Sequence, residues 1–320
     1  MLDVFHIPSS NSNTQIFYAA GATNWQTWSK PRGAKFIQIF CLGGGASGGS
    51  GYRGTAAGVR TGAGGGGSGG ITRAIYPAFL LSDTLYIRVG LGGASPAGTT
   101  TTNGVVGTAG GISYVSIAPT TTAVSVIAQS SAAGASGGGA TGATAFNNGG
   151  NPATTWDRTS SPFTSLGVLN IVAGVAGGAS TNATTLAITN IQSLSTNIVT
   201  GGAGGGSTNN VTIGSYFATA GGSILSASVI LTNNVPGGLT GSIIGAGNPG
   251  GSGYGSLSPF CGTGGSGGSG QASGSFAAGR GGDGWYGCGG GGGGTSVATV
   301  GTGGAGGKGG DGLVIITTIF

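Results

Sequence analysis

The sequence has very few charged residues. Only 5% of its 320 residues are Asp, Glu, Lys or Arg, and the acidic residues are five aspartates with no glutamate. Two carboxylates placed for glycoside cleavage are hard to assemble from so few acids, so we expect no enzymatic activity, and a glycan-cleaving spike is only a rival hypothesis. The ten Lys and Arg residues give a net charge of +5 but do not cluster, so we expect no nucleic-acid partner.

Metal-binding and redox-active residue types are also scarce. The only histidine is His6, which has no cysteine or acidic residue at useful spacing and is expected to be a surface or interface residue. The three cysteines, Cys41, Cys261 and Cys288, are odd in number and widely spaced, which excludes a disulfide framework and a zinc pattern. We expect buried free thiols, with a Cys261–Cys288 bridge as the alternative, and no metal site or cofactor.

Targeting and membrane-spanning segments are not evident. The amino terminus, MLDVFHIPSS, has no basic region followed by a long apolar run, so we expect no signal peptide. No apolar stretch approaches the length of a membrane span, so we expect no membrane insertion. The sequence predicts synthesis in a cytoplasm and, if the protein acts outside, export as part of something larger.

Strong helix formers are rare, and strands take their place. Glycine accounts for 79 residues and interrupts nearly every window that could otherwise form a helix. Four segments predict strands: 35–42 (KFIQIFCL), 84–90 (TLYIRVG), 111–118 (GISYVSIA) and 313–320 (LVIITTIF). The last is so apolar that, as an exposed edge, it would invite association, so it needs partners in the fold.

The middle of the chain, from Thr121 to about Gly250, is rich in Ala, Ser, Thr, Asn and Gly. Short apolar segments recur there with turn-forming punctuation, which predicts short strands: VSVIAQ, GVLNIVAGV, TTLAITNI, ASVILTN and SIIGAG. No exact repeat is present, so a solenoid of fixed period is not supported.

Glycine tracts form a third kind of material. They occur at 43–51, 62–70, 134–139, 201–206, 262–270 and 279–312, without the period that collagen requires. An extended three-fold helix points its amides and carbonyls outward, and only glycine lets several such helices bond one another directly. The predicted fold is therefore all-β, an antiparallel β-sandwich or jelly roll combined with packed polyglycine-II-type helices and long glycine-rich loops, with almost no α-helix.

An ordered set of segments resembles a known family. These are NWQTWSKPRGAKFIQIFCLGGGASGGSG, AIYPAFLLSDTLYIRVGLGG, GTAGGISYVSI, and GRGGDGWYGCGGGGGGTS with GTGGAGGKGGDGLVIITTIF. Together they are similar to the glycine-rich domain of bacteriophage tail fibres and related virion adhesins. The resemblance implies that residues 1–120 fold together with 255–320, with 121–254 inserted as a Ser/Thr/Asn/Ala-rich β region.

The resemblance also implies a function. It points to a virion structural protein on the particle surface, a tail fibre, spike or fibre tip that contributes to host attachment and contacts a host glycan or protein. Family members are often homotrimers, so the resemblance favours a trimer that binds other virion proteins. The alternatives are a capsid-decorating or head-fibre protein, and a secreted or cell-wall glycine-rich protein that is disordered until assembled.

Several short motifs have plainer explanations than catalysis. GxGxxG patterns are expected by chance at this glycine content, and none follows a strand and opens a helix. The segment around Lys308 resembles a phosphate-binding loop, but Gly309 stands where Ser or Thr would coordinate magnesium. Asp283 and Asp311 both lie in Gly-Gly-Asp-Gly, where accepting backbone amides in a tight turn is favoured over calcium binding.

The aromatic residues supply the candidate contact site. Trp25 and Trp28, three residues apart before a strand, are expected to face opposite ways, one in the core and one exposed. Large aromatics in polar loops suit stacking on sugars, although packing between layers is the commoner role. The candidate receptor or partner contacts are Tyr52, Trp156, Arg158, Tyr254, Phe260, Trp285 and Tyr286.

Overall fold

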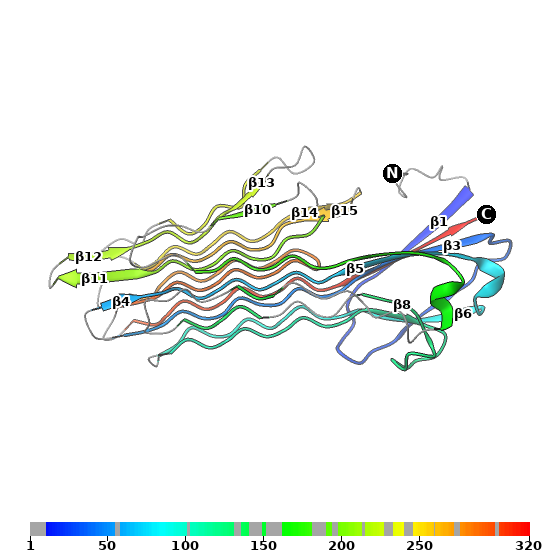
Figure 1. Ribbon diagram of the computed structural model, residues 1–320, viewed down its shortest axis with the longest axis horizontal. Helices are drawn as coiled ribbons and strands as arrows, with labels where there is room; N and C mark the ends of the chain where they lie inside the picture. The colour runs from blue at the N-terminus through cyan, green and yellow to red at the C-terminus, as the bar shows by residue number, and fades with distance from the viewer. Residues whose placement is uncertain are drawn as a thin grey trace.

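A computed structural model describes most of the chain: residues 11–54, 58–100, 103–130, 136–140, 149–151, 162–180, 190–193, 198–212, 215–226, 233–239, 246–258, 260–271, 276–297 and 301–320. The molecule is elongated, with two sheets at one end and a bundle of undulating extended segments running to the other (Figure 1). Helical structure in these ranges consists of two short 3-10 turns, η3 (Ala78–Leu80) and η5 (Pro162–Ser165), and of Asn11, which is also in 3-10 conformation. The prediction of almost no α-helix is confirmed.

The larger sheet has five strands in the order β1-β16-β3-β5-β9, all antiparallel. Their bounds are Ser12–Phe17 (β1), Leu313–Ile319 (β16), Phe36–Leu42 (β3), Ile71–Pro77 (β5) and Val168–Val172 (β9). The apolar strand at the end of the sequence therefore has a partner on each side and is not an edge.

The second sheet has four antiparallel strands in the order β2-β6-β7-β8. Their bounds are Gln26–Ser29, Thr84–Arg88, Tyr114–Ser116 and Val126–Gln129. One core joins the two sheets face to face, with Ile37, Ile39 and Tyr76 from the larger sheet packed among Leu85, Ile87 and Val115 from the smaller. The predicted antiparallel sandwich is confirmed, and Trp28 is buried in it while Trp25 stays partly exposed.

Smaller sheets lie along the bundle. A three-stranded antiparallel sheet of β4 (Gly58–Arg60), β11 (Thr208–Thr212) and β12 (Ser215–Ala218) lies at the far end (Figure 1). Two two-stranded sheets pair β14 (Gly255–Leu257) with β15 (Phe260–Gly262), and β10 (Ile191–Ser193) with β13 (Ile224–Ser226). The β10–β13 pair is parallel, unlike the antiparallel pairs of the two larger sheets.

The predicted middle strands fall partly within the described residues. VSVIAQ becomes β8 in the four-stranded sheet, and GVLNIVAGV becomes β9 in the five-stranded sheet. This part of the middle region therefore shares the sandwich with the terminal segments. TTLAITNI, ASVILTN and SIIGAG lie mostly outside the described residues.

The glycine tracts form extended rods with a repeat of three residues. Rod 43–52 continues directly from β3, and every third amide in it donates to the same neighbour. The acceptor rods are 105–111 for Gly44, Ser47 and Ser50, 304–310 for Gly45, Gly48 and Gly51, and 64–67 for Ala46 and Gly49. Three successive residues thus bond to three different neighbours, which is the geometry of a three-fold polyglycine-II helix.

The run Gly289–Gly294 is an interior rod of the bundle. Its six amides donate, at 2.8–3.1 Å, to carbonyls of Thr200, Ala46, Gly282, Ala203, Gly49 and Gly279. Its six carbonyls accept, at 2.7–3.0 Å, from amides of Gly265, Gly66, Gly307, Gly268, Ala63 and Gly304. Six rods therefore surround this one, and no backbone group in the run is left unbonded, as burial requires.

Glycine is required in this run because a neighbouring backbone occupies the place of every Cβ. A methyl group added at any of the six positions would lie 1.8–2.2 Å from a carbonyl oxygen of an adjacent rod. The lateral bonds and the absence of side chains are therefore two aspects of one packing arrangement, which offsets the entropy cost of ordering glycine.

Candidate functional site

Five aromatic rings form a continuous row where the sheets meet the bundle. Consecutive ring centroids are 5.8 Å apart for Tyr18 and Tyr286, 5.0 Å for Tyr286 and Trp285, 5.3 Å for Trp285 and Phe260, and 5.0 Å for Phe260 and Phe40. The structure thus brings together three of the predicted contact residues, Phe260, Trp285 and Tyr286. They come from β15 and from a tight turn between two rods.

That turn depends on one glycine. Cys288 donates its amide to the carbonyl of Trp285, and Gly287 between them has φ of +70°, a conformation that side chains rarely allow. A Cβ on Gly287 would also lie 2.6 Å from the side chain of Leu42. The turn therefore sets the Trp285 and Tyr286 rings beside β3.

The row is graded from buried to exposed. Phe260 and Phe40 are buried against Leu42, Ile71, Leu313 and Cys288, whereas Trp285, Tyr286 and Tyr18 keep partial or full exposure. Burial raises the pKa of Tyr286, and Tyr18 and Asp311 add smaller contributions in the same direction. Phe260 therefore serves as a packing residue, and Trp285 and Tyr286 offer the surface that a ligand could stack on.

Two cysteine thiols lie near this row. Cys261 and Cys288 are both buried and free, so the expectation of free thiols holds and the bridge between them does not form. Burial raises the pKa of the Cys288 thiol to about 12. A thiol with so high a pKa is a poor nucleophile, and it acts here as a small apolar core group.

The remaining predicted contact residues lie elsewhere. Tyr52 is buried near the far end, with the Arg60 guanidinium carbon 5.1 Å from its ring centroid. Tyr254 is partly exposed, and its hydroxyl donates to the carbonyl of Asn233. Trp156 and Arg158 lie outside the described residues. The contact role of all seven residues stays a prediction.

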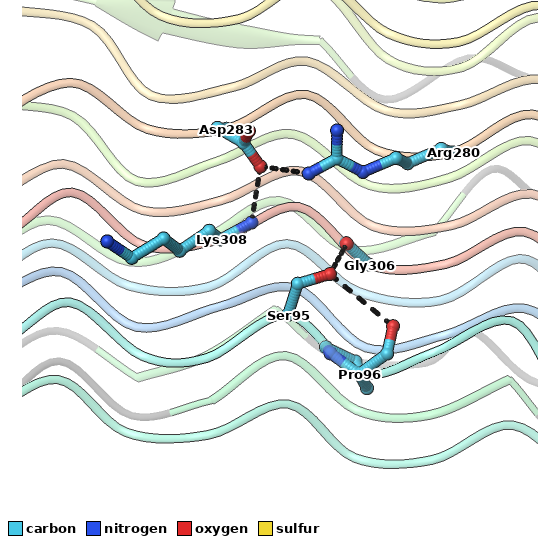
Figure 2. Close-up of polar contacts among 6 residues, drawn as sticks. All are labelled: Ser95, Pro96, Arg280, Asp283, Gly306 and Lys308. Carbon is cyan, nitrogen blue, oxygen red and sulfur yellow. Dashed lines mark hydrogen bonds and ion pairs between the residues drawn. The ribbon is translucent and has the colours of Figure 1, made fainter.

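The two Gly-Gly-Asp-Gly aspartates act as braces between rods. Asp283 accepts from the Arg280 guanidinium and, at 2.7 Å, from the backbone amide of Lys308 (Figure 2). Asp311 accepts from the amide of Gly92 at 2.8 Å and from the Lys308 ammonium at 3.1 Å. Backbone amides are accepted as expected, but they come from neighbouring rods instead of from a tight turn.

A serine makes a similar link nearby. The Ser95 hydroxyl lies between the carbonyls of Pro96 and Gly306 and bonds its own segment to the rod that carries Lys308 (Figure 2). Polar side chains on this side of the bundle are therefore engaged in joining rods.

Comparison with family models shows which family the sequence matches. The model of the glycine-rich domain matches residues 20–318, which is nearly the whole chain. The chain belongs to the glycine-rich domain family. No curated protein sequence matches it.

Within this glycine-rich domain, three members of the site were not among the contact residues predicted from the sequence: Tyr18, Phe40 and Arg73. Arg73 on β5 lies opposite Phe40 in the register of the larger sheet, and its guanidinium carbon is 5.5 Å from the Phe40 ring centroid. It extends the aromatic row by one residue. The signal was present in the strand ITRAIYP, where a single charged residue interrupts an apolar run on the same face as Ile71 and Ile75.

The far end of the glycine-rich domain carries a second group of polar residues. Arg60 pairs with Thr208 in the register of β4 and β11, and the Arg53 guanidinium donates to the carbonyl of Thr100. The Arg60 guanidinium lies over the Tyr52 ring, and Arg53 directly follows Tyr52 in the sequence. This end therefore combines positive charge with an aromatic ring.

The described ranges contain neither a metal-binding cluster nor a membrane-spanning helix. No three His, Cys, Asp or Glu residues there lie close enough together to hold a metal ion. That same part of the glycine-rich domain contains no helix with the length and apolar character that crossing a membrane requires.

Proposed function

We propose that this protein is a non-enzymatic structural protein of a virion, a component of a bacteriophage tail fibre, spike or fibre tip that contributes to attachment to a host surface. The observation that carries the proposal is the bundle itself. Laterally bonded rods run from the sheets and hold their connecting segments at the opposite end of an elongated molecule (Figure 1).

This arrangement suits adhesion. Binding residues concentrate on connecting segments that a rigid scaffold positions, and here the scaffold is fixed by main-chain hydrogen bonds that leave no carbonyl or amide of its interior rod Gly289–Gly294 free. Arg53 and Arg60 bring two cations to the far end, and the buried Tyr52 ring lies beneath the Arg60 guanidinium, which suits a host glycan or an acidic surface protein.

Two other assignments share the same support. A capsid-decorating or head-fibre protein would need the same rigidity, and so would a secreted or cell-wall glycine-rich protein once assembled. The resemblance to tail-fibre domains favours the first assignment, together with a homo-oligomer, a trimer by preference, on the particle surface.

Localisation tests the proposal. Antibodies against the purified chain, applied with gold labels to virus particles from producing cells, are expected to mark the ends of tail appendages, and mass spectrometry of those particles is expected to detect the chain. Labelling over the capsid would favour the decorating role. Labelling of cell walls without labelling of particles would overturn a virion function.

Attachment itself needs a separate measurement. The purified protein is expected to reduce adsorption of particles to host cells, and Arg53→Glu at the far end is expected to weaken that competition several-fold. Arg32→Glu makes the same charge change in an exposed turn at the sheet end and serves as the matched control. Equal competition by both variants would remove the far end from the attachment surface.

A further inference from the structure

The outer face of the five-stranded sheet carries an arginine among exposed apolar side chains. Alternate residues of its strands point away from the sandwich core. On β5 these include Arg73 and Ile75; Val168 on β9 lies directly opposite Ile75, and Phe36 lies on β3. Val168 is 73% exposed, Phe36 44% and Ile75 37%. We call Phe36, Arg73, Ile75 and Val168 the outer-face patch.

Arg73 is the unusual member of the patch. It is partly buried over the Phe40 ring, and burial lowers its pKa. The described aspartates pair elsewhere, Asp83 with Lys30, Asp283 with Arg280 and Asp311 with Lys308, so no described carboxylate faces it. A cation held partly out of water without a counter-ion is destabilising, and a carboxylate brought to it would offset that cost.

We propose that the outer-face patch binds a segment of a different protein in which Asp or Glu is flanked by aliphatic side chains. Contiguous exposed apolar residues mark interaction surfaces, and a guanidinium pairs with carboxylates in a two-pronged geometry. The apolar flanks would cover Ile75 and Val168 while the carboxylate meets Arg73.

Charge argues against a second copy of this chain as the occupant. The described residues of the two large sheets and their turns carry Lys30, Arg32, Lys35, Arg73 and Arg88 against a single acid, Asp83. Two such ends would repel each other. A lipid headgroup stays in water at the membrane surface, whereas this guanidinium lies against a ring within the sheet face, which favours a protein ligand.

The inference rests on the proposed function in one respect, that the protein has a neighbour in an assembly. It assigns that neighbour to the sheet end, remote from the far-end residues proposed for attachment. Gold labelling tests which assembly contains the protein, and crosslinking tests what covers the outer-face patch. The proposed function and the proposed partner can therefore fail independently.

The test is photo-crosslinking from position 168 in the cells that naturally produce the protein. p-Benzoylphenylalanine in place of Val168 is expected to crosslink to a peptide of another chain that contains Asp or Glu. Crosslinks to a second copy, to lipid, or to nothing would each overturn the proposal.

Charge variants of Arg73 test whether its guanidinium contributes to binding of the partner. In the crosslinking protein, Arg73→Glu is expected to reduce the yield at least tenfold, Arg73→Met to reduce it less, and Arg32→Glu to leave it unchanged. Replacing the partner's acidic residue with Arg is expected to restore the yield with Arg73→Glu. Unchanged yield with both Arg73 variants, each shown to be folded by thermal unfolding, would also overturn the proposal.

Discussion

Gly66 donates its amide hydrogen to the carbonyl of Gly290 at 2.8 Å, and the two glycines belong to rods from opposite ends of the sequence. On the other side of the same contact, a Cβ on Gly289 would lie 1.9 Å from the carbonyl oxygen of Gly66. These rods can approach closely enough to form the bond only because positions 66, 289 and 290 carry no side chain. Stability of the bundle therefore resides in the main chain.

Gly291→Ala is expected to destabilise the protein severely. Its new methyl group would lie 2.0 Å from the carbonyl oxygen of Ser266, so rods must move apart and lateral bonds must break. We expect a loss of about 3 kcal/mol in the free energy of unfolding, measured by chemical denaturation.

Gly251→Ala is the matched control for that substitution. The nearest atom to its added methyl group is a side-chain carbon of Val235 at 3.1 Å, which can give way. We expect the free energy of unfolding to change by less than about 1 kcal/mol. Similar losses for the two variants would contradict the close-packed rod geometry.

Amide hydrogen exchange tests the interior rod directly. The amides of Gly289–Gly294 are all bonded to neighbouring rods, so they are expected to exchange only when the bundle opens. Residues of the exposed turn 21–24 are expected to exchange rapidly and provide the internal reference. Equal rates in the two segments would mean that the rods are not ordered in solution.

Alkaline pH is expected to destabilise the protein through buried thiols. Burial raises the pKa of Cys288 from its ordinary value of 9.0 to about 12. The unfolded chain therefore loses this proton first, so the stabilisation is complete below pH 9 and is lost as pH rises from 9 towards 12.

Thermal unfolding between pH 7 and 10.5 measures this effect. Cys288→Ala is expected to make the fall in unfolding free energy above pH 9 shallower by about 1 kcal/mol per pH unit, although it lowers stability at pH 7. An unchanged slope in the variant would show that the thiol titrates normally in the folded protein.

The aspartate braces are expected to contribute modestly. Asp283→Ala removes the acceptor of the Lys308 amide, and Asp311→Ala removes the acceptor of the Gly92 amide. Both carboxylates are partly exposed, so each loss is expected to be about 1 kcal/mol in chemical denaturation. Asp83→Ala breaks an ion pair at a 92% exposed side chain and is expected to change stability by less than about 0.5 kcal/mol. Losses no larger than this control would refute the brace role.

Strand identity and rod formation could be predicted because they depend on local composition. KFIQIFCL is apolar on both faces and becomes the central strand β3, and glycine tracts without a Cβ have few packing arrangements that satisfy their amides. The parallel pairing of β10 with β13 could not be predicted, because it depends on the order of rods in the bundle, which short strands do not encode.

The site was harder to predict than the fold. Trp285 and Tyr286 stand out in sequence because they interrupt glycine, but their contact with Phe260 and Tyr18 depends on a turn at Gly287 and on the position of β15. Arg73 could not be recognised as part of the site because its role depends on contact with Phe40. The two residues are far apart in sequence and become neighbours only when β3 pairs with β5.

The rod bundle also has a mechanical consequence. Its hydrogen bonds run sideways between extended segments, so a pull applied between the far end and the sheets loads many of them in shear at the same time. Under a pull in that direction, the hydrogen bonds cannot break one after another. An extended backbone also has little slack to give, so the molecule would transmit tension with hardly any lengthening.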